Sequence, residues 1–181
     1  MESSTFSNDK TQTYSGSVSH QLPSRNRQAQ FARQYDQLAR TRLSKNFILR
    51  DFLFCTASAS RGLSNYPEHP QAVITAGQAL CETLLEPVLG KFGEFAITYG
   101  YQSRESIDIE LAAMGRPVHR HSSSPHHWTR QTFGDQVYAR VDILPFCVED
   151  GLVTKHDFGH WLMYNLDVDL LMTWTRSTSI A

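Results

Sequence analysis

The clearest pattern in the chain is helical and lies between Pro70 and Val88, where apolar residues recur every three or four positions. Proline is tolerated in a first helical turn, and Gly90 and Gly93 are typical of a helix end. Pro87 has no N–H to donate, so it should kink or tighten the last turn. The pattern therefore predicts one long helix from Pro70 to about Gly90.

Three other segments have helical patterns. Residues 24–44 are rich in Arg, Gln, Ala and Leu, with apolar side chains near helical spacing, and predict a basic amphipathic helix. This helix is either a solvated surface element or a contact for a partner or an anionic surface. Residues 46–54 are densely apolar and predict a buried turn or short helix. Residues 106–114 predict a short helix that ends at Gly115.

Three runs alternate apolar residues with smaller or polar ones, namely residues 95–101, 139–143 and 168–174. This period of two is typical of strands that are buried on one face. The combination of several helices with a small sheet predicts the α+β class.

The chain has 181 residues, of which 40% are hydrophobic, and this is enough for one core. We predict a flexible polar arm over residues 1–23, because so few apolar groups cannot offset the entropy of ordering, and a single domain over residues 24–181. The first residues lack the apolar stretch of a signal peptide, and no run approaches the roughly 20 apolar residues of a membrane span. We therefore expect cytoplasmic synthesis without a signal peptide, and no transmembrane segment.

The charges and cysteines exclude several classes of partner and site. The formal net charge is −1, so the chain as a whole has no field that would attract nucleic acid, and we expect no nucleic-acid partner. The three cysteines are widely spaced and include no CxxC pair. They indicate neither a disulfide framework nor a thiolate zinc site.

A cluster of histidines points to metal chemistry. Six of the eight histidines lie between residues 119 and 160. Zinc in a hydrolase typically takes three His or carboxylate side chains and leaves one position for water. His126 and His127 precede the predicted strand that holds Asp142, and a hairpin-like return would bring one of them beside that carboxylate. Asp135 is a competing carboxylate, and the alternative for Asp142 is an ion pair with Arg140.

The third zinc ligand is predicted to be His160. If the segment around it is helical, His156 and His160 lie on one face at positions i and i+4, a spacing that can chelate a metal. Asp157 and His160 are then neighbours as well. If the segment is extended, His160 shares a face with Phe158 instead.

Three segments carry a resemblance to a known family. They are residues 46–52 (NFILRDF), residues 80–88 (LCETLLEPV) and residues 97–103 (ITYGYQS). From Leu43 to Pro145 the chain resembles the zinc D-Ala-D-Ala carboxypeptidase family, which has the Hedgehog/D,D-peptidase fold. The resemblance implies a small antiparallel sheet flanked by helices and a zinc ion held by His, Asp and His.

The resemblance also assigns roles to residues of this chain. It implies that His126 or His127, Asp142 and His160 hold zinc and that Asp157 activates the attacking water. It places substrate binding at the end of the first strand, with Gln102 where the family has an arginine that binds the substrate carboxylate. The segment concerned comprises Tyr101, Gln102, Ser103 and Arg104. The family motif Ser-x-His-x-x-Gly-x-Ala-x-Asp is shorter than the stretch from His127 to Asp142, so the resemblance implies an insertion.

Two functions are expected on this basis. The first is a zinc-dependent D,D-carboxypeptidase-like hydrolase that acts on peptidoglycan stem peptides, phage-associated or delivered to the cell wall by a partner. The alternative is a catalytically inactive protein of the same fold, a structural or interaction component that binds the protein partners of a larger assembly.

Overall fold

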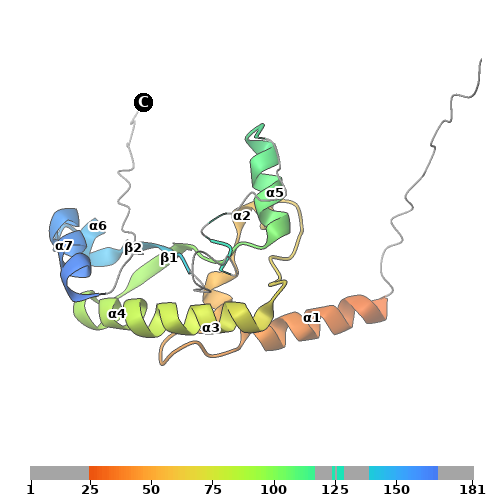
Figure 1. Cartoon of the computed structure of the whole chain (residues 1–181), viewed down its shortest axis with the longest axis horizontal. Helices are drawn as coiled ribbons and strands as arrows, with labels where there is room; N and C mark the ends of the chain where they lie inside the picture. The colour runs from red at the N-terminus through yellow and green to blue at the C-terminus, as the bar shows by residue number, and fades with distance from the viewer. Residues whose placement is uncertain (1–24, 117–123, 125, 129–138, 167–181) are drawn as a thin grey trace, which may run out of the picture.

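The computed structural model describes residues 25–116, 124, 126–128 and 139–166, and Figure 1 shows them as a helical rod with a small sheet and shorter helices packed beside it. The α+β class predicted from the sequence is confirmed. The predicted arm over residues 1–23, the predicted strand over residues 168–174 and the competing carboxylate Asp135 lie outside the described residues.

The rod is the predicted long helix, and it has three parts. They are α3 (Pro70–Leu80), the π turn η2 (Cys81–Leu85) and α4 (Glu86–Phe92). The rod ends at Gly93, whose φ of 79° suits glycine. Pro87 does not tighten the helix as predicted. Instead the turn before it is widened, with the Glu86 N–H bonded to the Cys81 carbonyl, because proline cannot donate and its ring crowds the preceding turn.

The sheet consists of β1 (Phe95–Tyr99) and β2 (Asp142–Pro145), which pair in antiparallel fashion. Phe95 lies opposite Pro145, and an irregularity between Ile97 and Tyr99 places Tyr99 opposite Asp142. The second strand begins later than the predicted run over residues 139–143. One reason is that the Arg140 carbonyl accepts a hydrogen bond from the Trp128 indole rather than from a strand.

The shorter helices largely follow the predictions. α1 ends at Ala39 rather than near residue 44, because the chain turns there and forms an isolated bridge between Arg42 and Ile48. Ser103 caps the predicted helix over residues 106–114, which therefore begins two residues earlier. The bounds are α1 (Arg25–Ala39), η1 (Leu49–Phe52), α2 (Thr56–Ala59), α5 (Arg104–Ala113), α6 (Phe146–Glu149) and α7 (Lys155–Asn165).

Two clusters of buried side chains hold these elements together. The larger cluster joins the rod to η1 and the strand end, and its largest members are Trp128, Tyr101 and Phe52. The smaller cluster packs α7 on the end of α4 through Val88, Phe158 and Leu162. The three cysteines are free. Figure 1 shows α6 and α7 at one end of the rod and α1 and α5 toward the other.

One described stretch, residues 70–92, has the length and composition of a membrane span. This is weak evidence for a membrane segment, since a core helix passes the same test. Val73, Cys81, Leu85 and Val88 of this stretch are fully buried, which is what a core helix requires.

Candidate functional site

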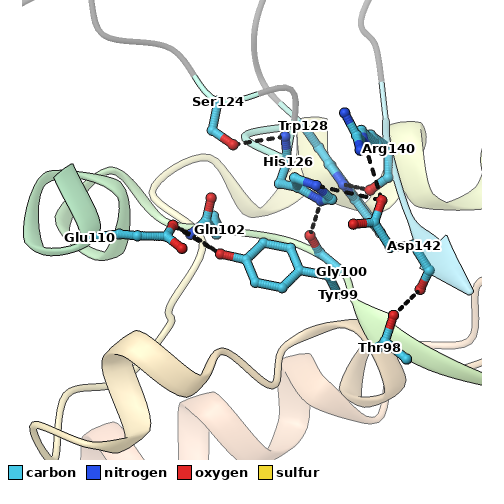
Figure 2. A network of polar contacts seen from close by, with 10 residues as sticks. All are labelled: Thr98, Tyr99, Gly100, Gln102, Glu110, Ser124, His126, Trp128, Arg140 and Asp142. Carbon is cyan, nitrogen blue, oxygen red and sulfur yellow. Dashed lines mark hydrogen bonds and ion pairs between the residues drawn. The ribbon is translucent and has the colours of Figure 1, made fainter. Parts of the chain in front are cut away.

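His126 lies beside Asp142 at the start of β2, as Figure 2 shows. The distance from His126 Nε2 to Asp142 Oδ1 is 3.8 Å, which is too long for a hydrogen bond. The other ring nitrogen, Nδ1, is 2.9 Å from the Gly100 carbonyl oxygen. A carbonyl can only accept, so Nδ1 carries the proton and the Nε2 lone pair of the neutral ring faces the carboxylate.

Backbone contacts fix the segment that carries this histidine. The Gln102 N–H donates to the His126 carbonyl at 2.9 Å, so the turn after β1 pairs with the histidine segment. The next residue but one, Trp128, is completely buried, and its indole N–H donates to the Arg140 carbonyl at 3.0 Å. The orientation of His126 is therefore set by contacts among three segments that are far apart in the sequence, namely residues 100–102, 126–128 and 139–140.

His127 points toward a different carboxylate. Its Nδ1 is 3.0 Å from the Gln102 carbonyl oxygen, and its Nε2 is 3.9 Å from Glu68 Oε2. Of the two histidines that the sequence left as alternatives, His126 is therefore the one that the structure brings to Asp142.

The environment of His126 favours its neutral form. Burial lowers the pKa of its imidazole and the charge of the Arg140 guanidinium lowers it as well. The Asp142 carboxylate and hydrogen bonds to the Gly100 and Arg140 carbonyls act in the opposite direction without cancelling this effect. The neutral ring is the form that can bind a metal. Arg140 also donates from Nε to Asp142 Oδ1 at 3.1 Å, so the ion pair considered from the sequence is present as well.

Tyr99 and Glu110 form a second polar layer next to His126, which no sequence pattern predicts. The Tyr99 ring lies edge-on to the imidazole with ring centres 4.5 Å apart. Its hydroxyl donates to Glu110 at 3.0 Å, and the Gln102 side-chain amide donates to the same carboxylate oxygen at 2.6 Å. Burial raises the pKa of Tyr99, so the phenol stays protonated at neutral pH. These contacts join β1 to α5 and leave no local signal in the sequence.

The segment predicted to bind substrate is mostly engaged within the fold. Tyr101, Gln102 and Ser103 are buried, and the Ser103 N–H donates to Asn65 at 2.7 Å. Arg104 is the only one of the four with a partly exposed side chain, and its Nε lies 3.2 Å from Asp108 Oδ1. Substrate binding by this segment stays a prediction, for which Arg104 has the most accessible side chain.

Asp157 and His160 do not join His126 and Asp142. Both lie on the exposed face of α7, where Asp157 accepts a hydrogen bond from the Thr154 hydroxyl at 2.7 Å. In the described part of the chain, no group of three His, Cys, Asp or Glu side chains is placed to hold a metal. The third ligand, His160, and the base, Asp157, that the resemblance implies are therefore not where the implied zinc site needs them.

Together these contacts define an α+β protein with a buried imidazole facing a carboxylate at the end of a two-stranded sheet. No model of a known protein family, no curated protein and no solved structure matches this chain. The likeness to the zinc carboxypeptidases therefore rests on the sequence motifs, and a function has to be argued from the site itself.

Proposed function

We propose that this protein is a zinc-dependent, carboxypeptidase-like hydrolase of peptidoglycan stem peptides, with His126 and Asp142 as two of the zinc ligands. The observation that carries the proposal is the meeting of these two side chains. Their 3.8 Å separation exceeds a hydrogen bond. It is within the span of about 4 Å that two ligands can cover when each lies about 2.0–2.2 Å from one zinc ion.

The two donors fit zinc in chemistry as well as in distance. Imidazole and carboxylate are both common zinc ligands. The Gly100 carbonyl fixes the tautomer of His126 through Nδ1, which is the usual support of a metal-binding histidine. The proposal requires a third donor outside the described residues, where the sequence offers His119, His121 and Asp135.

Within this proposal the residues have distinct roles. Zinc, when bound by His126 and Asp142, supplies a Lewis acid and lowers the pKa of its bound water to about 7. Arg104 binds the terminal carboxylate of the peptide, since its guanidinium is the accessible cation of the strand-end segment. Asp157 is given no part in proton transfer, because its carboxylate is bonded within the first turn of α7.

The test is release of D-alanine from a stem pentapeptide by the zinc-loaded full chain. We expect release by the parent protein and none by His126→Ala, which removes a ligand. His127→Ala is the matched control, because its imidazole faces Glu68, and it should keep activity. Equal activity in the parent and in His126→Ala would contradict the proposal.

A second candidate function is favoured by the contacts of Asp142 and Gln102. Arg140 already neutralises Asp142, and Gln102 stands where the family has its carboxylate-binding arginine and is bonded to Glu110. An inactive protein of this fold would use its exposed surfaces, such as residues 25–34 of α1, to bind protein partners. A zinc-loaded parent that releases no D-alanine would favour this second function.

A further inference from the structure

The exposed face of α7 carries two histidines and a tyrosine that form a continuous stack. The ring centres of His156 and His160 are 6.0 Å apart with an interplanar angle of 24°, and those of His160 and Tyr164 are 4.3 Å apart. The three residues are four positions apart along one helix, so their side chains lie one above the other. All three are exposed, whereas Phe158 and Leu162 face the core from the other side of the helix.

We propose that His156 and His160 form a metal-binding site for a divalent transition metal that prefers imidazole, such as zinc, nickel or copper. A metal lies about 2.0–2.1 Å from an imidazole nitrogen and the ring centre roughly 1 Å farther, so the centres of two imidazoles on one ion are at most about 6.3 Å apart, and closer when the ion is tetrahedral. The observed 6.0 Å lies near this upper limit, so a rotation of the two exposed side chains brings their nitrogens onto one ion. The site is separate from His126 and Asp142 and does not depend on the proposed hydrolase activity.

Neighbouring groups contact both rings. Asp157 Oδ1 is 3.5 Å from His156 Nδ1, so a carboxylate lies beside one nitrogen of that ring and leaves the other for the metal. Tyr164 packs on His160 from the next turn and limits the motion of its ring. Two histidines at positions i and i+4 of a formed helix are also the spacing used by helical zinc sites.

Binding at this site would stabilise the end of the molecule where α7 packs on α4. A ligand that binds only the folded state adds stability by mass action. The two histidines can be bridged only while α7 is helical, so an ion bound there holds the helix that presents Phe158 and Leu162 to the smaller core cluster. The whole protein would then bind more zinc ions per chain than the single ion of the proposed hydrolase site.

The experiment is calorimetric titration of the full chain with Zn²⁺ and then Ni²⁺, in an Asp142→Asn background that removes a ligand of the other proposed site. We expect one ion per chain, with affinity reduced at least tenfold by His156→Ala and equally by His160→Ala. His69→Ala, which replaces an exposed histidine outside α7, should leave the affinity unchanged. His160→Gln provides a second variant that keeps the helix and a polar side chain.

The proposal would be overturned by either of two results. One is that the Asp142→Asn protein binds neither ion. The other is that it binds an ion with the same affinity after His156 or His160 is replaced. Neither result bears on the hydrolase proposal, since Asp142 is absent from every protein in this titration.

Discussion

Gly100 has two roles near the site, and the second of them requires glycine. Its carbonyl oxygen holds Nδ1 of His126, and its Cα lies against the backbone of Phe52. A Cβ built on this residue would be 2.5 Å from the Phe52 carbonyl oxygen and 2.8 Å from the Phe52 Cα. Backbone atoms cannot move aside as a flexible side chain can, so the close approach of β1 and η1 depends on the missing side chain.

We predict that Gly100→Ala lowers the free energy of unfolding by about 2–3 kcal/mol, the upper part of the usual range for overpacking. Gly90→Ala is the matched control. Its Cβ would meet nothing within 4 Å, and alanine should stabilise α4 by about 0.5–1 kcal/mol. Urea unfolding of the two variants checks this. Equal stability of the two variants would show that Gly100 has room for a side chain.

Arg140 is the residue that most opposes zinc binding at Asp142. Its guanidinium bonds to the same carboxylate oxygen that faces His126, at 3.1 Å, and a fixed cation there opposes a second one. We predict that Arg140→Gln raises the zinc affinity about two- to fivefold, which corresponds to the roughly 0.5–1 kcal/mol of a partly exposed ion pair. Competition with a zinc-sensitive dye measures the affinity. A lower affinity in Arg140→Gln would contradict a role for Asp142 as ligand.

At the scale of elements, the rod α3–η2–α4 organises the molecule, and Glu86 ties it to the turn after α1. The carboxylate of Glu86 accepts hydrogen bonds from the Ser44 hydroxyl and the Asn46 backbone N–H, each at 2.7 Å, and from the Asn46 side-chain amide. These bonds, the Ser44 one foremost, lower the pKa of Glu86 below its usual 4.5. The charged form is therefore the one that stabilises the fold.

A carboxylate with a lowered folded-state pKa contributes stability above its unfolded pKa and loses it as pH falls through the folded pKa. We predict that Glu86→Gln costs about 1 kcal/mol at pH 7, because the group is partly exposed and its bonds are partly screened by solvent. The difference from the parent should vanish as pH falls well below 4.5. Glu82→Gln, an exposed change on the same rod, is the control and should cost little. Urea unfolding at pH 7 and pH 3.5 makes the comparison, and a difference at pH 3.5 as large as that at pH 7 would refute this reading.

The elements show which features the sequence could predict. The rod was predictable because its apolar period is long and Pro70 and Gly93 mark its ends. The π turn was not, because proline restricts the turn before it without specifying how the backbone adapts. The end of α1 at Ala39 could not be predicted, because Leu43 continues the helical spacing of apolar residues. In the structure Leu43 is buried, but it lies in a turn that Glu86 and the Arg42–Ile48 bridge stabilise.

The site was predictable only in part, because local residue types indicate candidates whereas long-range contacts select among them. The residue types and the resemblance singled out His126, His127 and Asp142, but the choice between the histidines depends on which backbone carbonyl each ring meets. Those carbonyls belong to Gly100 and Gln102, which are distant in sequence. The sequence could not separate His160 from the predicted ligands His126, His127 and Asp142, because it does not show which way the side chains of α7 point relative to the sheet.

At the scale of the whole molecule, the His126–Asp142 pair exists only when the strand end, the histidine segment and β2 are assembled together. Trp128 links the last two of these through its bond to Arg140 and anchors them in the larger core cluster. We predict that Trp128→Phe keeps the ring in the core but loses the indole hydrogen bond, at a cost of about 1–2 kcal/mol, and weakens zinc binding. Thermal unfolding with and without zinc measures both effects, and an unchanged zinc-dependent shift would show that the pair does not need this anchor.

The most direct test of the account is the number of zinc ions bound per chain, measured by equilibrium dialysis. The His156→Ala, His160→Ala double variant is the reference protein, so that ions on α7 are not counted. The account predicts one zinc per chain for this reference and none after either His126→Ala or Asp142→Asn is added. Absence of zinc from the reference, or one zinc retained in both added variants, would contradict the claim that these two side chains hold a metal.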